Sequence, residues 1–422
     1  GKLMACFVVP DYEERRSAVL RAIGEIEAAN GFKVAVDDEL IESVTNLTEF
    51  PVPAIGRFDE KFLVLPKDVL ITSMKTHQKF FSVSAPDRRI QPFFVVVTNS
   101  PQGDIAEIVR GNERVLNARL NDAMFFYNED TSKPLESYVE RLSGRIFLTG
   151  LGTMRDKAGR LMRLAPEICG ILDCGADPET VKRAAMLAKA DLATAMVGEF
   201  PELQGTIGME YALKSGEEPA VAVAVFEHYL PRFAGDGVPR TNAGKVLSIA
   251  EKIDTIAGCF AVNLIPSGSE DPYALRRSAG GILKIMLDGG YEASLENLLR
   301  PALRIYRDAV QTGDEAALIC RVEEFFYSRL ESILTADHGI PTEFALAVLG
   351  ARFEGHYGEM KAIHSPKSIL DRAASLLYFY RNPATAEKFE PLMVTYRRVL
   401  NIMKGQETRD FTPSLFRQTE EA

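Results

Sequence analysis

The chain has 422 residues, a net charge of −10 and 46% hydrophobic residues, which predicts two or three domains with a large core. The negative charge argues against nonspecific coating of nucleic acids, although a local basic patch could still bind RNA. Five scattered cysteines form no disulfide framework, and the first apolar run, residues 3–9, is too short to span a bilayer. We therefore expect a cytoplasmic protein without a membrane segment.

The first part of the chain, residues 1–155, predicts a mixed α/β module. Apolar residues at helical spacing predict a helix over 11–30, which a glycine ends. Residues 62–83 and 91–99 are rich in β-branched and aromatic side chains and predict strands, with the segment APDRR as a hairpin connection. The stretch PFFVVVTN is almost uniformly apolar, which predicts a strand that is buried on both faces.

Two groups of basic side chains in this module could contact phosphates. The candidates are Lys75, His77 and Lys79 along one predicted strand, and Arg110, Arg114 and Arg119 near the start of the next helix. Alternate strand residues share a face, so Phe81 would lie beside the first group and Phe80 behind it. Gly111 and Asn112 are expected to open the helix, with Asn112 as its cap. The alternatives are a solvated sheet edge and pairing of Arg119 with Asp122.

Helices dominate the rest of the chain. They are predicted over 179–198, 219–230, 242–261, 272–288, 295–311, 314–335, 342–350, 366–380 and 385–404. The fold class is therefore α+β, with an all-helical domain over 156–300 and further helices over 301–422. The segment GDGVPRTNAGKV lacks the spacing of a phosphate-binding P-loop. Asp271 followed by Pro272 favours a helix N-cap, with a glycine-rich anion cradle as the alternative.

Three polar side chains of the helical part, Asp191, His228 and Asp254, are expected on inward faces of different helices. They could gather around a divalent cation, in an order similar to that of HD phosphohydrolases. The match is incomplete, because Lys189 and Ala190 precede Asp191 where an HD motif has its histidine. One imidazole and two carboxylates beside a lysine would hold a metal weakly. A helical core with satisfied buried polar groups is the alternative, and no signature of nucleophilic catalysis is present.

Eight stretches of the sequence occur together in the order and spacing of one family. They are TNLTEFPV, FDEKFLVLP, MKTHQKFFSV, GNERVLNARLNDAMFFYNED, KADLATAMVGEFPELQGTIGMEYA, EHYLPRFAGDGVP, EKIDTIAGCF and PSGSEDPYALRR. On these blocks the chain resembles the β subunit of the bacterial tetrameric glycyl-tRNA synthetase from about residue 11 to 300. The helices up to about residue 404, which end on YRRVLNIMKG, fit the family more loosely.

The resemblance implies an enzyme of two α and two β subunits that charges tRNA-Gly with glycine through glycyl-adenylate. It implies that ATP, Mg and glycine bind to the α subunit, and that this chain adds tRNA recognition and assembly, with no catalytic residue, metal or cofactor of its own. A full β subunit extends past both ends of this chain. We therefore expect a fragment without the N-terminal part and most of the C-terminal anticodon-binding domain.

The resemblance also implies roles for the two parts of the chain. Residues 1–155 would form a tRNA-binding and editing-like module, in which the six basic candidates contact tRNA. Residues 156–300 would form a degenerate HD-like domain, with a site remnant of Lys189, Asp191, His228 and Asp254. Two other functions stay open: a metal-dependent HD-type phosphohydrolase, and an assembly scaffold that never contacts RNA.

Overall fold

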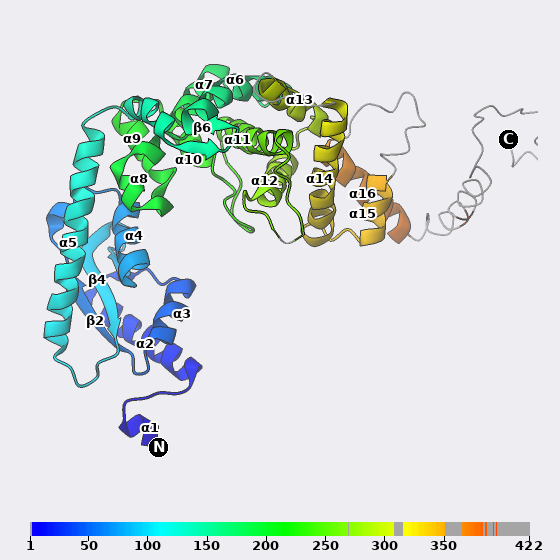
Figure 1. The fold of residues 1–422 in the computed structure, drawn as a ribbon. Helices are drawn as coiled ribbons and strands as arrows, with labels where there is room; N and C mark the ends of the chain where they lie inside the picture. The colour runs from blue at the N-terminus through cyan, green and yellow to red at the C-terminus, as the bar shows by residue number, and fades with distance from the viewer. Residues whose placement is uncertain are drawn as a thin grey trace, which may run out of the picture. The chain divides into compact units, whose positions relative to one another are not determined.

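The structure is a computed structural model (Figure 1). The structure describes residues 2–268, 270–307, 315–350 and 365–382, together with residues 385, 391 and 394. The chain divides into two compact units, residues 1–323 and 324–422. The fold is α+β, mainly helical with a small antiparallel sheet, as predicted. None of the described helices has the length and apolar character needed to cross a membrane.

A four-stranded antiparallel sheet with the order β1-β3-β4-β2 organises the N-terminal part. Its strands are β1 (Lys33–Val34), β2 (Val52–Arg57), β3 (Phe81–Ser84) and β4 (Ile90–Thr98). The helices are α1 (Lys2–Ala5), α2 (Tyr12–Asn30), α3 (Asp38–Leu47), α4 (Lys67–Gln78) and α5 (Ile105–Thr131), with a 3-10 turn at Glu60–Val64. Ile55 of β2 and Phe81 of β3 both pair with Val95, so β4 lies between these two strands.

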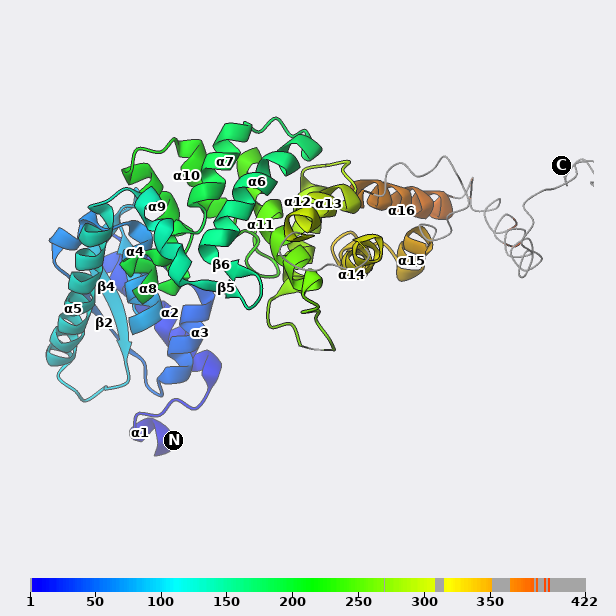
Figure 2. The same ribbon diagram turned by 45° about the horizontal axis from the view of Figure 1, so that its top comes forward.

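Both faces of this sheet are covered. On one face, Val95 packs in a cluster with Ile23 of α2 and Ile41 of α3. On the other face, the ring of Phe94 stacks on Phe80 at a centroid distance of 4.6 Å. Helix α5 packs against β2 and runs beside the sheet in both views (Figures 1 and 2). The prediction of a buried central strand and of a hairpin between β3 and β4 is confirmed.

The strand predicted over residues 62–83 is wrong for most of its length, because residues 67–78 form helix α4. Val69, Leu70, Ser73 and Met74 are its buried positions, and their spacing is helical. Lys79 ends the helix in the left-handed conformation, with a φ of 58°. Strand β3 begins only at residue 81, so Phe80 lies outside the strand and the expected alternation of faces does not apply. Both Phe80 and Phe81 are buried.

Two predicted helix starts in this part have different outcomes. Helix α2 is confirmed: the Asp11 side chain accepts a hydrogen bond from Glu14 N, and Gly31 ends the helix with a φ of 68°. The start predicted at Gly111 and Asn112 is wrong, because both residues lie inside α5. Its N-cap is Asp104, whose carboxylate accepts from Ala106 N and Glu107 N.

The following part of unit 1 is helical around one central helix. A short hairpin, β5 (Ile146–Leu148) and β6 (Gly152–Thr153), leads into it. Its helices are α6 (Met154–Leu172), α7 (Pro178–Leu187), α8 (Ala195–Glu199), α9 (Thr206–Lys214), α10 (Pro219–Glu227), α11 (Asn242–Ala261), α12 (Leu275–Asp288) and α13 (Leu295–Arg307). Helix α11 is buried along most of its length and contacts α6, α7, α10, α12 and α13 (Figure 2).

Several helices in the helical part differ from prediction or escaped it. The helix predicted over 179–198 is broken into α7, a 3-10 turn at Ala190–Ala193 and α8. Helix α12 begins at Leu275, three residues after the predicted start, although the Asp271 carboxylate still accepts from Leu275 N. Helices α6 and α9 were not predicted at all. The helix over 242–261 is confirmed to the residue.

The described helices at the end of the chain are α14 (Glu315–Ala336), α15 (Thr342–Gly350) and α16 (Pro366–Arg381). They confirm the helices predicted over 314–335, 342–350 and 366–380. Within unit 2, Phe344 of α15 packs on Tyr380 of α16 at a centroid distance of 5.2 Å. The helix predicted over 385–404 and the block YRRVLNIMKG lie almost entirely outside the described residues. The domain boundaries predicted near residues 155 and 300 stay predictions.

Candidate functional site

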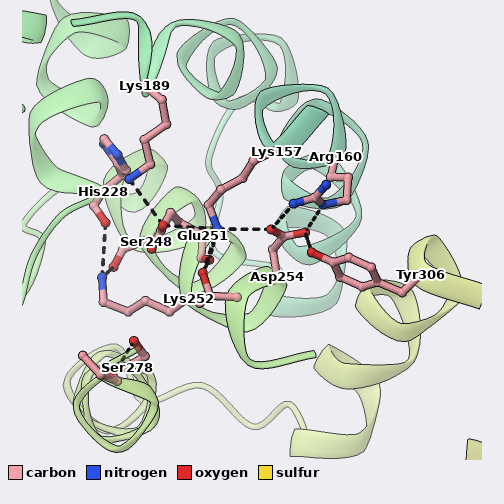
Figure 3. Close-up of polar contacts among 12 residues, drawn as sticks. Lys157, Arg160, Lys189, His228, Ser248, Glu251, Lys252, Asp254, Ser278 and Tyr306 are labelled. Carbon is pink, nitrogen blue, oxygen red and sulfur yellow. Dashed lines mark hydrogen bonds and ion pairs between the residues drawn. The ribbon is translucent and has the colours of Figure 1, made fainter. Parts of the chain in front are cut away.

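Asp254 lies in the helical part, on the side of α11 that faces α6 (Figure 3). Its carboxylate accepts hydrogen bonds from Lys157 Nζ at 3.1 Å, from Arg160 Nε at 2.8 Å and Nη2 at 3.2 Å, and from the Tyr306 hydroxyl at 2.9 Å. The side chains of Asp254 and Lys157 are each only 1% exposed. Such charges are stable in the interior only when they are paired and hydrogen-bonded. Both oxygens of Asp254 are therefore occupied by cations of the chain.

Glu251, one helical turn before Asp254, bridges two lysines. Its carboxylate lies 3.3 Å from Lys157 Nζ and 3.3 Å from Lys189 Nζ. Burial alone would raise the pKa of Glu251, but Lys157, Lys189 and Lys252 outweigh it and hold that pKa well below its usual range. Burial lowers the pKa of Lys189, against the opposing effect of Glu251. The carboxylate is thus ionised, and lysine ammonium groups balance its charge.

Lys252 forms a second polar centre on the opposite side of α11. Its ammonium group donates to the backbone oxygens of His228 at 3.2 Å and Leu230 at 2.8 Å, and to Ser248 Oγ at 2.8 Å. These acceptors are all neutral, so burial dominates and lowers the pKa of Lys252 to about 8. The lysine thereby ties the end of α10 to the central helix.

His228 and Asp191 are buried beside this network, and the half-buried Tyr229 lies next to them. His228 Nδ1 donates to Val225 O at 2.5 Å, because a carbonyl oxygen can only accept, and burial lowers the pKa of the imidazole well below its usual value. Asp191 Oδ2 accepts from Gly205 N at 2.5 Å, and burial raises the pKa of this carboxyl to about 6. His228 Nε2, Asp191 Oδ1 and the Tyr229 hydroxyl have no hydrogen-bond partner within the described residues.

The hypothetical cation site of Asp191, His228 and Asp254 is not assembled in this geometry. Asp254 is bound by Lys157 and Arg160, while Asp191 and His228 lie near Lys189. Within the described ranges, no three His, Cys, Asp or Glu side chains are grouped so that they could hold a metal ion. Lysine and arginine side chains thus supply the positive charge that a bound cation would otherwise bring.

Two of the basic candidates in the N-terminal part are engaged by neighbouring acids. Lys75 lies on α4, and its Nζ is 3.1 Å from Asp37 and 3.5 Å from Glu39. Arg110 lies on α5 and is paired with Glu107 at 2.5 Å, one turn earlier. Exposed pairs of this kind contribute little to stability, so an incoming anion could compete for both cations.

Two further candidates face the acidic end of α8 and the turn that follows it. His77 Nε2 lies 3.2 Å from Glu202, without the alignment of a hydrogen bond, and its ring packs edge-on against Phe200. Arg119 Nη1 lies 3.3 Å from Glu199, rather than pairing with the nearby aspartate suggested by the sequence. Both side chains therefore connect the N-terminal part to the helical part.

Lys79 and Arg114 differ from the other four candidates. Both are exposed, and neither has an acidic partner within the part of the chain that the structure describes. Lys79 caps the C-terminus of α4, whereas Arg114 lies on α5. The prediction that Lys75, His77 and Lys79 share one face of a strand is wrong, because this segment is helix α4 and its cap. The three arginines do lie on one helix, α5, as predicted. The role of all six side chains in RNA binding stays a prediction.

Several members of the buried network were not predicted from the sequence. They are Lys157, Arg160, Glu251, Lys252 and Tyr306. Basic residues at helical spacing are usually solvated, and α6 itself was not recognised. One signal was present: Glu251 precedes Asp254 by three residues, which places two carboxylates on adjacent turns of an otherwise apolar helix.

The comparisons with known proteins agree on one family. The sequence profile described as glycyl-tRNA synthetase beta subunit matches residues 1–350. The chain is 41% identical over 409 residues to the glycine--tRNA ligase beta subunit of Desulforamulus reducens, covering 96% of this chain and 57% of that protein. The protein of the same name from Syntrophus aciditrophicus is 42% identical over 415 residues, covering 98% and 58%. That of Shouchella clausii is 44% identical over 347 residues, covering 82% and 50%. The chain thus spans between 50% and 58% of the length of these relatives.

Proposed function

The chain belongs to the family of glycyl-tRNA synthetase β subunits, and from this premise we propose that it provides tRNA recognition and assembly in a cytoplasmic glycine–tRNA ligase. The observation that carries the proposal is the family match over residues 1–350. In this proposal two α and two β subunits form the enzyme. The α subunit binds ATP, Mg and glycine and forms the adenylate, whereas the β subunit binds tRNA-Gly.

We further infer that the helical part is an HD-like domain that has lost its metal chemistry. The pairing of Asp254 with Lys157 and Arg160 supports this inference, because a metal ligand needs a free carboxylate oxygen. The same pairing argues against a metal-dependent phosphohydrolase. The N-terminal part would be the tRNA-binding and editing-like module, and the exposed Lys79 and Arg114 are its best-placed phosphate contacts.

The division of labour is tested by reconstitution. The full-length β subunit that contains this chain, the α subunit and their mixture are each assayed for charging of tRNA-Gly with glycine. We expect charging only by the mixture. Charging by the β subunit alone would contradict the assignment of catalysis to α, and a mixture that leaves tRNA-Gly uncharged would contradict the proposed function. A stoichiometric divalent ion that is lost on changing Asp191, His228 and Asp254 would favour the phosphohydrolase instead.

A further inference from the structure

An open cavity of about 520 Å³ lies above the buried network, on the outer side of α6. Its lining comes from α6, from the β5–β6 turn and from α13. Three arginines of α6, Arg155, Arg160 and Arg163, contribute to this lining, against a single acidic residue, Asp156. In a chain with a net charge of −10, such a local excess of positive charge is unusual.

Asp156, the acidic residue of this cavity, already accepts hydrogen bonds at the start of α6. The Asp156 carboxylate accepts hydrogen bonds from Thr153 N at 2.7 Å and Thr153 Oγ1 at 2.8 Å, as part of the capping box that starts α6. These bonds lower the pKa of Asp156, so the side chain stays ionised and held at the helix start. Its charge acts on Arg155 and Arg160 from a distance, but no ion pair joins it to the arginines of the cavity within the described residues.

The two outer arginines are available to a ligand. Arg163 is exposed and has no partner among the contacts of the described residues. Arg155 is paired with Glu140 at 2.9 Å, but that glutamate is 78% exposed. A surface ion pair of this kind is weak, so a more highly charged anion could displace Glu140 from the guanidinium group.

Gly159 leaves a hollow between these two side chains. Residues 155, 159 and 163 follow each other at intervals of four, so they share one face of α6. A Cβ atom built on Gly159 would meet only Arg155 Nη1, at 3.8 Å. The guanidinium group of Arg155 thus reaches over the bare backbone of the glycine, and space is left above the helix between Arg155 and Arg163.

Arg160 forms the floor of the cavity and is held rigidly. It donates to both oxygens of Asp254 and to Leu151 O, which uses three of its five N–H groups. Tyr306, which also lines the cavity, donates to the same carboxylate. The buried network therefore keeps a preorganised guanidinium group directly below the hollow, with two N–H groups still free to donate.

We propose that this cavity binds a backbone phosphate of tRNA, held from the sides by Arg155 and Arg163 and from below by Arg160. The inference rests on the proposed function and adds a contact outside the N-terminal module. A phosphodiester suits the site better than a nucleotide, because Tyr306 is only 1% exposed and offers no open aromatic face on which a base could stack. Guanidinium groups bind phosphate oxygens in paired hydrogen bonds.

The first test measures tRNA-Gly binding to the complete enzyme, assembled from α and the full-length β subunit. Arg163→Glu and Arg155→Glu are compared with Lys182→Glu, an equal charge change at an exposed position on the adjacent helix α7. We expect each arginine variant to raise Kd roughly tenfold and to reduce the salt slope of binding by about one. Lys182→Glu is expected to bind like the unchanged enzyme.

The second test leaves the charge unchanged. Gly159→Gln places a side chain in the hollow, whereas Gly159→Ala adds a single methyl group in open space. We expect Gly159→Gln to weaken tRNA binding several-fold, roughly as far as an arginine variant does, and Gly159→Ala to have no effect. Gly159→Gln fills the hollow without changing the charge. Weaker binding by this variant would therefore result from blocking the phosphate site and not from a general change in the electrostatic field.

The outcomes discriminate between the possible sources of the anion. Unchanged tRNA binding by Arg163→Glu and Gly159→Gln, in an enzyme that still charges tRNA-Gly, would overturn this site alone. Loss of the tetramer mass in Arg163→Glu would show that the cavity contacts the α subunit rather than RNA. Displacement of tRNA from the unchanged enzyme by free ATP, but not from Arg163→Glu, would assign the site to a nucleotide. Failure of the unchanged enzyme to charge tRNA-Gly would overturn the proposed function itself.

Discussion

At the scale of single residues, the buried charges of α11 show how strongly a side chain depends on its partners. Asp254 and Glu251 are ordinary acids in sequence, but in the structure they hold Lys157, Arg160 and Lys189 in the interior. The cost of burying each charge is offset only by its neighbours. Removing one member should therefore cost far more than removing a surface ion pair.

Asp254→Ala is expected to lower the free energy of unfolding by about 3–5 kcal/mol, because Lys157 and Arg160 would be left buried without their carboxylate. Urea unfolding followed by circular dichroism measures the change. The control is Asp38→Ala, which breaks an exposed pair with Arg16 and should cost at most about 1 kcal/mol. Equal losses in the two variants would show that the buried network does not stabilise the fold.

Asp191 should make stability depend on pH in the acidic range. Burial raises its pKa to about 6, from an ordinary value of 3.8, so the native state binds this proton more tightly than the unfolded state does. The stabilisation of the native state by this proton is fully present below about pH 4 and is lost as pH rises through 6. For such a shift the loss is roughly 3 kcal/mol.

Asp191→Asn is the matched variant, because its side-chain oxygen can still accept from Gly205 N while the group no longer titrates. We expect unfolding free energies of the two proteins to converge at pH 4 and to separate by pH 7, with the asparagine variant more stable. The titration of His228 is common to both proteins and cancels in the comparison. A difference that is constant between pH 4 and 7 would contradict the raised pKa.

The residues of this site were only partly visible in the sequence. Asp191, His228 and Asp254 were correctly placed in the interior, since helical periodicity identifies inward positions. Their partners could not be found in that way, because pairing between α6 and α11 depends on tertiary packing. A lysine such as Lys157 looks like a surface residue until the opposing carboxylate is known.

At the scale of secondary structure, local signals predicted some elements well and others poorly. Apolar spacing identified α2 and α11, and a glycine marked the end of α2. Both helices also satisfy end groups locally, through the side chains of Asp11 and Thr241. Helix α4 was mistaken for a strand, since its β-branched residues favour strands while its burial pattern is helical. The break between α7 and α8 depends on the turn around Asp191, which tertiary contacts stabilise.

Close packing of α10 on α11 depends on a glycine. A Cβ atom on Gly244 would lie 2.7 Å from Glu227 Cβ, and the Glu227 carboxylate holds the loop before α11 through Arg240 N and Thr241 N. Gly244→Ala is therefore expected to lower the free energy of unfolding by about 1–3 kcal/mol.

Gly111→Ala provides the opposite case for the same experiment. Gly111 lies inside α5, and a Cβ atom there would have nothing within 4 Å. Alanine should stabilise the helix by about 0.5–1 kcal/mol, because it restricts the unfolded chain and clashes with nothing. Thermal and urea unfolding measure the change in the free energy of unfolding for Gly244→Ala and Gly111→Ala. If both changes had the same sign, the packing argument would be contradicted.

At the scale of the whole molecule, a chain of net charge −10 can bind a polyanion only through local groups of cations. Four of the six basic candidates in the N-terminal part are paired with acids, and Lys79 and Arg114 are the exposed exceptions. Specific placement of a few unpaired cations, rather than overall charge, would then determine where RNA binds.

Lys79→Gln and Arg114→Gln are expected to weaken tRNA-Gly binding by the assembled enzyme, each with a decrease of about one in the salt slope. Filter binding over a range of salt concentrations measures both quantities. Lys133→Gln, which changes an exposed lysine that follows α5, serves as the control. If all three variants bind tRNA equally well, the N-terminal part has no phosphate contact at these positions.

The length of helix α5 affects how far the N-terminal part moves when the helix tilts. Near its C-terminal end, the Asp130 carboxylate accepts from Ala195 N at 3.0 Å and Met196 N at 2.9 Å, which fastens it to the start of α8. The helix has 27 residues and packs along the sheet. At 1.5 Å per residue it is a lever about 40 Å long, so a tilt of about 5° at Asp130 moves the far end by roughly 3–4 Å. Small rotations at one aspartate would thus be amplified into displacements comparable to the diameter of a phosphate group.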